Sequence, residues 1–183
     1  MRAILIDWLV DVHLKFKLLP ETLYITVNLI DRYLEKERVA RNKLQLIGVT
    51  CMLIAAKYEE IYPPELKNFV YITDNAYSRK EVLQMEYNIL SKLGFDVTFP
   101  SCFRFLERFA KLFAVKDTTF SLAHYYLDVA ALDYRMLTFA PSQVSATALY
   151  MACKVTESSA VVNESMCKMH LGYSEHELQN CVH

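Results

Sequence analysis

Residues 43–64 read KLQLIGVTCMLIAAKYEEIYPP, and this stretch decides the fold class. Its middle is almost wholly apolar, and Pro63-Pro64 stop it. A helix that is apolar on all sides has to be buried on all sides. The longest apolar run, Ile47 to Ala56, is about half of the ~20 residues that a membrane helix needs. We therefore expect a central buried helix over about 43–60, enclosed by the other helices of a bundle.

The remaining sequence has helical periodicity nearly everywhere. Pro20 followed by an acid opens one helix, and Ser78-Arg79-Lys80-Glu81 is a capping box that opens another. In the first half we expect helices at 1–17, 20–36 and 43–60, a short one starting at Pro63-Pro64, and one from Ser78 to about Gly94. A second series is expected at about 102–114, 119–135, 142–157, 163–169 and from 174 onward.

The two series of helices resemble each other. Ala55-Ala56-Lys57 is matched 97 positions later by Ala152-Cys153-Lys154, and Tyr77-Ser78-x-x-Glu81 is matched 96 positions later by Tyr173-Ser174-x-x-Glu177. Two matches at nearly the same offset indicate a duplicated unit. The sequence thus predicts an all-α protein of two tandem five-helix bundles, 1–98 and 99–183.

Both ends of the chain lie within predicted helices. No capping residue precedes the first helix, and His183 lies about two and a half turns into the last one. We therefore expect a fragment of a longer protein, with an incomplete second bundle.

Composition excludes several classes of protein. The chain has 183 residues, of which 54% are hydrophobic and 22% charged, so it can bury a sizeable core and is not disordered. Three glycines and five prolines leave little turn chemistry for a β-sandwich or barrel. A net charge of −1 argues against a nucleic-acid partner. Five unpaired cysteines and no signal peptide or membrane span favour a reducing, intracellular compartment without a membrane partner.

Catalytic and cofactor motifs are absent from the sequence. It contains no glycine-rich phosphate loop, Cys-x-x-Cys, His-Glu-x-x-His or Gly-x-Ser-x-Gly. Glu59 and Glu60 should not form a catalytic dyad, because neighbours on a helix diverge by about 100°. We expect this pair to be a solvated helix end. The best metal candidates match no common zinc spacing; they are Cys167, His170, His176, Cys181 and His183. We expect no catalytic residue, no metal and no cofactor.

Several distinctive motifs follow one another along the chain. They are Met1-Arg2-Ala3-Ile4-Leu5-Ile6-Asp7-Trp8-Leu9-Val10, Lys43-Leu44-Gln45-Leu46, Ala55 to Pro64, Tyr71-Ile72-Thr73-Asp74, Gln84-Met85-Glu86, Leu132-Asp133-Tyr134 and Pro141-Ser142-Gln143. They cover essentially the whole chain and are densest over 1–100. In this order the motifs resemble one family, the cyclins, and most closely the B-type mitotic cyclins.

The resemblance implies a regulatory subunit without catalysis of its own. A cyclin binds a cyclin-dependent Ser/Thr kinase and selects its active state, here at the G2/M transition, in nucleus and cytoplasm. The alternative is a twin-cyclin-fold transcription adaptor that resembles the general initiation factors. The net charge of −1 weighs against that alternative, because such domains need a basic face.

The resemblance also assigns site residues. Lys57 and Glu86 match the pair that contacts the kinase, although spacing alone favours an ordinary ion pair within the chain or two surface charges. Arg2, an arginine among apolar neighbours, needs a partner, and the cyclin pattern makes Asp31 that partner. The apolar positions expected around the kinase-binding pair are Ile54, Tyr58, Leu90, Phe95 and Val97.

One apolar stripe of the first helix is left for a partner. Met1, Ile4, Leu5 and Trp8 share a face by their spacing, which alone would indicate core. In cyclins this face is exposed and docks Arg-x-Leu motifs of substrates or inhibitors. The polar residues that match the rim of that groove are Asp11, Arg41 and Gln45.

Three cations lie near the junction of the bundles. Lys92 precedes the junction, and Arg104 and Arg108 follow it at i, i+4 spacing. They could hold a phosphate group together. The other interpretation, three solvated surface charges, stays open.

Overall fold

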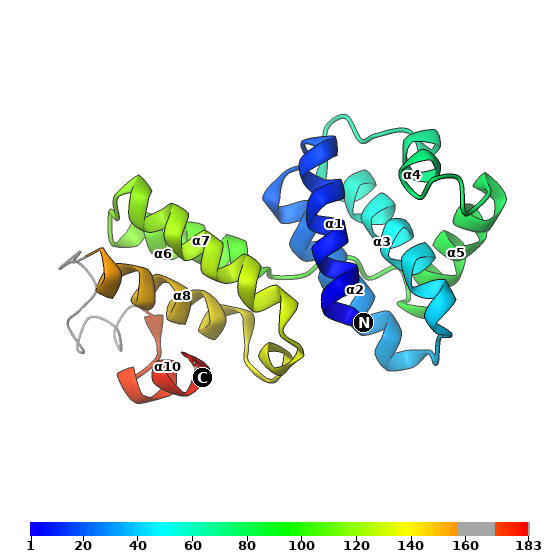
Figure 1. Ribbon diagram of the computed structural model, residues 1–183. Helices are drawn as coiled ribbons and strands as arrows, with labels where there is room; N and C mark the ends of the chain where they lie inside the picture. Colours follow the sequence, from blue (N-terminus) through cyan, green and yellow to red (C-terminus); the bar gives the residue numbers. More distant parts are fainter. Residues whose placement is uncertain (157–170, 183) are drawn as a thin grey trace. The chain divides into compact units, whose positions relative to one another are not determined.

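The computed structural model describes residues 1–156 and 171–182, and no strand occurs within these ranges (Figure 1). The chain divides into two compact units, Met1–Phe99 and Pro100–His183. Each unit is a helical bundle, which confirms the all-α class expected from the sequence. Within the described ranges, no helix is both long enough and apolar enough to cross a bilayer.

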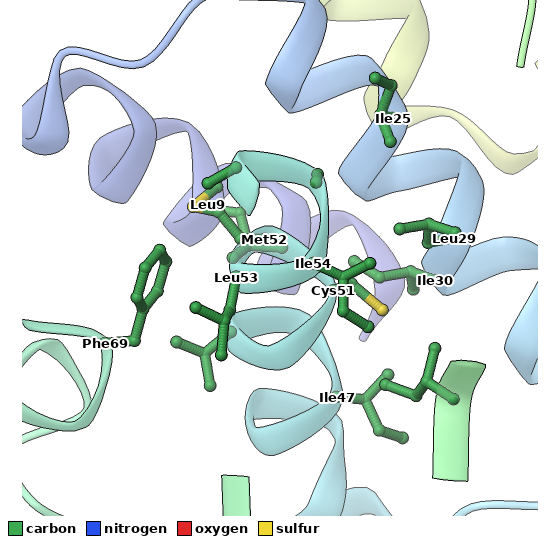
Figure 2. Close-up of a cluster of buried hydrophobic side chains, with 14 of the residues drawn as sticks. Leu9, Ile25, Leu29, Ile30, Ile47, Cys51, Met52, Leu53, Ile54 and Phe69 are labelled. Carbon is green, nitrogen blue, oxygen red and sulfur yellow. The ribbon is translucent and has the colours of Figure 1, made fainter. Parts of the chain in front are cut away.

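The first unit is built around one buried helix. This helix is α3 (Leu44–Glu59), and all of its residues from Leu46 to Ala56 are buried, as the apolar stretch predicts. Figure 2 shows Leu9, Leu29 and Phe69, which belong to three other helices, gathered around it. The elements of this unit are α1 (Arg2–Phe16), α2 (Pro20–Lys36), the short 3-10 helix η1 (Arg41–Lys43), α3 (Leu44–Glu59), α4 (Leu66–Ile72) and α5 (Arg79–Lys92).

The contact between α1 and α3 depends on Gly48. A Cβ atom at Gly48 would lie 2.9 Å from Cδ1 of Leu5 and 3.2 Å from Cδ1 of Leu9. Both leucines are buried, so they have little room to withdraw. The missing side chain therefore lets α1 lie close against α3, and it commits Leu5 and Leu9 to the core.

The second unit repeats the plan around α8. Its residues Val144 to Tyr150 are all buried, and the helix packs against α6, α7 and α10. The elements described in this unit are α6 (Cys102–Leu112), α7 (Asp117–Leu132), the 3-10 helix η2 (Tyr134–Thr138), α8 (Pro141–Val155) and α10 (Glu175–Val182). The predicted helix at 163–169 lies outside the described residues.

The matched tyrosine-serine-glutamate motifs form the same capping hydrogen bonds in both units. In each, the glutamate accepts a hydrogen bond from the serine N–H, at 2.9 Å for Ser78 and 2.8 Å for Ser174, and the serine hydroxyl accepts from the glutamate N–H. The tyrosine before it contacts η1, just ahead of the central helix, in the first unit and the first turn of the central helix in the second. Tyr77 donates to the carbonyl of Asn42, and the hydroxyls of Tyr173 and Ser142 lie 2.7 Å apart.

Two predicted helix boundaries are wrong for local reasons. Helix α4 starts at Leu66 and not at Pro63-Pro64: Pro64 keeps Pro63 out of helical geometry, and the backbone of Glu65, the residue before the helix, is extended. Helix α7 ends at Leu132 and not at 135. There the Asp133 side chain accepts a hydrogen bond from the Arg135 N–H and begins the 3-10 helix η2.

Candidate functional site

Lys57 and Glu86 meet on the outer side of α3 and α5. The Lys57 ammonium lies 2.7 and 3.0 Å from the two carboxylate oxygens of Glu86. The lysine side chain is 49% exposed, whereas that of Glu86 is 14% exposed. The cation is thus open to solvent above a mostly covered acid. An ammonium has three donors, and only two point at Glu86, so the third can serve a partner.

The aromatic side chains expected around this pair are exposed. Tyr58, next to Lys57 on α3, is 52% exposed, and Phe95, just beyond α5, is 66% exposed. Leu90 and Val97 are half-buried and pack against the core of the first unit. Ile54 differs from the expectation of a contact residue, because it is buried within α3 and offers a partner almost no surface. We call Lys57, Tyr58, Glu86 and Phe95 the α3–α5 face.

Phe95 is held in an unusual backbone conformation. Its φ is +58°, directly after Gly94 at +64°, and left-handed values are uncommon for residues other than glycine. The Phe95 N–H donates to the carbonyl of Leu90 at 2.8 Å and so closes the end of α5. A large apolar side chain in a strained position that points to solvent is a feature that contact with a partner would explain.

The segment that follows Phe95 is tied to two other helices. Arg32 of α2 donates to both the carbonyl and the carboxylate of Asp96, each at 3.0 Å. The hydroxyls of Tyr58 and Thr98 lie 2.9 Å apart. Sequence reasoning missed Arg32, Asp96 and Thr98 as parts of the site. No periodic signal joins an arginine to an acid 64 positions later, so only the tertiary structure reveals the link.

The expected docking stripe is divided by the packing of α1. Met1 and Ile4 are 59% and 69% exposed, and Trp8 is half-buried against the core. Leu5 is buried against Gly48 instead, and the stripe loses it as a contact residue. The polar residues assigned to the rim are exposed at Asp11 and Arg41 and half-buried at Gln45.

Arg2 and Asp31 form a two-pronged ion pair between α1 and α2. Nε and Nη2 of Arg2 donate to the two carboxylate oxygens of Asp31 at 2.7 and 2.8 Å. The side chains are 18% and 14% exposed. A mostly covered pair with this parallel geometry locks two helices together and leaves little for a partner to contact.

The three cations considered for a phosphate group each lie near an acid or in solvent. Lys92, in the first unit, forms an ion pair with Glu37. In the second unit, Arg104 lies 3.0 Å from Glu107, and Arg108 is exposed one turn further along α6. Existing ion pairs would compete with a phosphate for Lys92 and Arg104. The pocket stays a prediction.

Glu60 is not the solvated helix end that was expected. Its carboxylate accepts hydrogen bonds from the Leu19 N–H at 2.7 Å and from the Thr22 hydroxyl at 2.6 Å. It therefore caps the start of α2 from the far end of α3. Of the weak metal candidates, His176 and Cys181 lie on α10, exposed and buried respectively, and the other three lie outside the described residues.

Three of the described cysteines, Cys51, Cys153 and Cys181, are buried. Burial raises the pKa of the Cys51 thiol well above its ordinary range and also raises the pKa of Cys181. A thiol held neutral in this way is a poor nucleophile. Both side chains therefore act as small apolar residues of the core.

Two duplicated helical units, each with a helix buried at its centre, define a cyclin fold. Residues 1–98 match the family model described as cyclin, N-terminal domain, and residues 100–183 match cyclin, C-terminal domain. The chain belongs to the cyclin family.

Curated relatives with mitotic names match the full chain. It is 44% identical over 182 residues to the G2/mitotic-specific cyclin S13-7 of Glycine max, covering 100% of this chain and 70% of that protein. It is 46% identical over 182 residues to the G2/mitotic-specific cyclin-B of Marthasterias glacialis, covering 100% and 47%. Apart from the Glycine max protein, the chain spans about half, or less, of the length of these relatives.

Solved structures share the fold at low identity. A viral cyclin from herpesvirus saimiri matches with a TM-score of 0.88 and 20% identity, over 99% of this chain and 80% of that one. A chain of the yeast RNA polymerase II CTD kinase CTDK-1 complex matches with a TM-score of 0.80 and 14% identity, over 98% and 62%. At these identities the likeness establishes the cyclin fold alone.

Proposed function

We propose that this chain is a non-catalytic regulatory subunit that binds and activates a cyclin-dependent Ser/Thr protein kinase, and that it acts at the G2/M transition. Membership of the cyclin family and the mitotic names of its relatives support the proposal. The single observation that carries it is the α3–α5 face. It combines an accessible ion pair with two exposed aromatic side chains.

The chemistry of this face suits a protein partner. Exposed aromatic residues beside a charged pair are typical of the residues that dominate binding energy at interfaces. The Lys57 ammonium keeps a donor for an acceptor on the kinase, and Tyr58 and Phe95 add apolar area. A kinase held in its active state by such contacts becomes more active because the subunit binds that state more tightly.

The test uses a panel of purified monomeric cyclin-dependent kinases. Their affinity for the chain is measured by isothermal titration calorimetry, and phosphorylation of a short peptide is measured with and without the chain. We expect no phosphate transfer by the chain alone and a rise of orders of magnitude with at least one kinase. Lys57→Ala and Glu86→Ala should each weaken binding by about 2 kcal/mol or more.

Lys154→Ala is the matched control. Lys154 holds the position on α8 that Lys57 holds on α3, and its ammonium lies 3.0 Å from Glu175 with 46% of the side chain exposed. Its removal breaks an ion pair of the second unit, which contributes no residue to the α3–α5 face, and the lysine is about as exposed as Lys57. Wild-type affinity in both Lys57→Ala and Glu86→Ala, or an equal loss in Lys154→Ala, would contradict the proposal.

The transcription-adaptor alternative is tested on the same preparation. It requires binding to duplex DNA, which a chain with a net charge of −1 does not favour. Fluorescence anisotropy with a labelled DNA duplex at low and at physiological salt measures it directly. DNA binding without any kinase affinity would replace the kinase proposal with this one.

We also propose that Met1, Ile4 and Trp8 form a docking patch for Arg-x-Leu motifs of substrates or inhibitors. Exposed apolar residues on one helix face, beside the exposed acid Asp11, support it. The leucine of the motif would cover Ile4 and Trp8, and its arginine would lie toward Asp11. Leu5 is left out because it is buried.

Ile4→Asp is the sharpest variant for this patch. Ile4 is 69% exposed, so the change should hardly affect folding, whereas Trp8→Ala would also remove core packing. We expect Ile4→Asp to weaken an Arg-x-Leu peptide about tenfold or more and to leave kinase activation on a short generic peptide unchanged. Leu14→Asp, at a leucine on another side of α1 that is 65% exposed, is the control. Equal peptide affinity in the two variants would disprove the patch.

The expected location, nucleus and cytoplasm, is part of the proposal. Within residues 1–156 and 171–182 no cysteine forms a disulfide, which agrees with a reducing compartment. Fluorescence microscopy of the tagged protein through the cell cycle measures it. Exclusive residence in a secretory organelle would contradict both the location and the kinase assignment.

A further inference from the structure

The α3–α5 face includes one residue, Phe95, that lies beyond the end of its helix. Backbone hydrogen bonds from the Phe95 N–H to the Leu90 carbonyl, at 2.8 Å, and from the Asp96 N–H to the Leu93 carbonyl, at 3.3 Å, close the turn. Helix α5 ends at Lys92, and the chain then passes through two consecutive left-handed residues, Gly94 and Phe95. Segment 96–98, which follows, has no regular secondary structure. The direction of the Phe95 side chain therefore depends on what anchors the residues around it.

Arg32 provides the most specific of these anchors. One guanidinium nitrogen donates to the backbone carbonyl of Asp96 and another donates to its carboxylate, each at 3.0 Å. A planar guanidinium that holds two groups of a single residue restrains the orientation of that residue as well as its position. The restrained residue directly follows Phe95.

The Arg32 side chain is partly covered by the protein. It is 26% exposed, while that of Asp96 is 64% exposed, so the arginine approaches the segment from the protein side. The Asn28 side-chain oxygen lies one helical turn earlier on α2, at 3.5 Å from the Arg32 guanidinium. Helix α2 contributes no residue to the α3–α5 face. Arg32 therefore reaches that face only through Asp96.

Two weaker anchors complete the arrangement. Val97 packs against the core of the first unit, and the Thr98 hydroxyl lies 2.9 Å from that of Tyr58. Val97 holds segment 96–98 against the core, and Thr98 connects the end of that segment to Tyr58 of the α3–α5 face. Neither contact reaches the carbonyl or the carboxylate of Asp96, the two groups that Arg32 holds.

We infer that Arg32 is a positioning residue for kinase binding: through Asp96 it holds Phe95 in the outward conformation in which the kinase meets it. The inference rests on the proposed function, and it adds a determinant on a helix outside the contact face. An arginine with a purely structural role would change stability and would act independently of Phe95.

The experiment is a double-mutant cycle. The affinity of the full chain for the best-binding kinase of the panel is measured by calorimetry for wild type, Arg32→Gln, Phe95→Ala and the combined variant. We expect Arg32→Gln to weaken binding about tenfold, and Phe95→Ala at least as much. In the Phe95→Ala background, Arg32→Gln should have no further effect, since the residue it positions is gone.

Graded variants separate the two contacts of Arg32. Asp96→Asn keeps the carbonyl and should lose less affinity than Arg32→Gln. Arg32→Lys keeps the positive charge but lacks the planar guanidinium that reaches both groups of Asp96. Its affinity should therefore lie between those of wild type and Arg32→Gln. The melting temperature of Arg32→Gln should fall by only about 2–3 °C or less, as expected for a partly exposed pair. Arg135→Gln is the control, because it breaks an exposed arginine–aspartate pair in the second unit and should bind like wild type.

The outcomes distinguish this inference from the proposed function. If Lys57→Ala loses binding while Arg32→Gln binds like wild type, the positioning role is overturned and the kinase assignment stands. Additive losses in the combined variant, or wild-type affinity in Phe95→Ala, would also overturn it. If the wild-type chain binds no kinase in the panel, the proposed function fails first.

Discussion

Two ion pairs of the first unit each join a cation to a carboxylate, but they differ in how far solvent reaches them. The side chains of Arg2 and Asp31 are 18% and 14% exposed, and their contact is two-pronged. The Lys57 side chain is 49% exposed above a covered Glu86. Removal of Glu86 leaves the Lys57 ammonium, which water can reach, whereas removal of Arg2 leaves the Asp31 carboxylate, which water hardly reaches. The first pair should therefore matter for folding and the second for binding.

Arg2→Met should lower the free energy of unfolding by about 2–3 kcal/mol, since it leaves the Asp31 carboxylate mostly covered and without its two donors. Glu86→Gln should lower it by less than about 1 kcal/mol, because the Lys57 ammonium that remains is half exposed to water. Urea unfolding followed by circular dichroism measures both. The double variant Arg2→Met/Asp31→Leu should recover much of the loss, because no uncompensated charge remains. Equal small losses in the two single variants would contradict this division of roles.

At the scale of the helix, both units start their last described helix with the same device. The Ser78 and Glu81 pair at α5 and the Ser174 and Glu177 pair at α10 each satisfy backbone donors that a helix start leaves open. The hydrogen bonds from the Ser78 backbone and then from its hydroxyl hold the pKa of the Glu81 carboxyl below its usual value. The cap of α5 is thus linked to pH.

The sign of this linkage predicts an acid-dependent loss. Because the pKa of Glu81 is lowered in the folded chain, its contribution is complete above the unfolded value of about 4.3 and is lost as the pH falls through the folded value. Glu81→Gln removes the titrating group. We therefore expect the stability of wild type to rise more steeply between about pH 3 and 5 than that of Glu81→Gln, in urea unfolding at stepped pH.

Ser78→Ala is the companion variant for this cap. It removes one donor to the Glu81 carboxylate, so its pH dependence should be intermediate. It should also cost about 1 kcal/mol at neutral pH, as the loss of an N-cap serine typically does. Identical pH dependence in all three proteins would show that the capping box contributes nothing in this range.

At the scale of the whole molecule, each unit encloses its own buried helix. Met52 of α3 and Leu149 of α8 hold equivalent positions 97 residues apart, and both are fully buried. The one tryptophan of the chain, Trp8, belongs to the first unit. Its fluorescence therefore reports on that unit, whereas circular dichroism reports on the helices of both.

Leu149→Ala should destabilise the second unit by about 2–5 kcal/mol, because it leaves a cavity in a closely packed core. Circular dichroism should then show an early partial loss of helix while Trp8 fluorescence melts at the wild-type temperature. Met52→Ala should instead lower the transition seen by Trp8. If Leu149→Ala shifts both signals together, the two units unfold as one and the prediction is wrong.

Local pattern by itself determined the class of this protein. The apolar run of residues 46–56 requires a buried helix whatever surrounds it, and the two capping boxes define helix starts through contacts three residues apart. The repeat at 96 and 97 positions predicts two like units. These features depend on neighbours along the chain, so they can be read without a structure. The site residues Lys57 and Glu86 came from resemblance to a family, and spacing alone did not single them out.

The tertiary structure alone decided which side chains a partner can reach. Ile4 and Leu5 are consecutive apolar residues, yet one is 69% exposed and the other is buried because Gly48 of another helix admits it. Ile54 is likewise lost to the core, and Glu60 caps a helix that starts 40 positions earlier in the chain. The period of a helix determines the direction of a side chain around its own axis. Which neighbour covers that direction, and which distant charge reaches it, as Arg32 reaches Asp96, depends on how the helices pack.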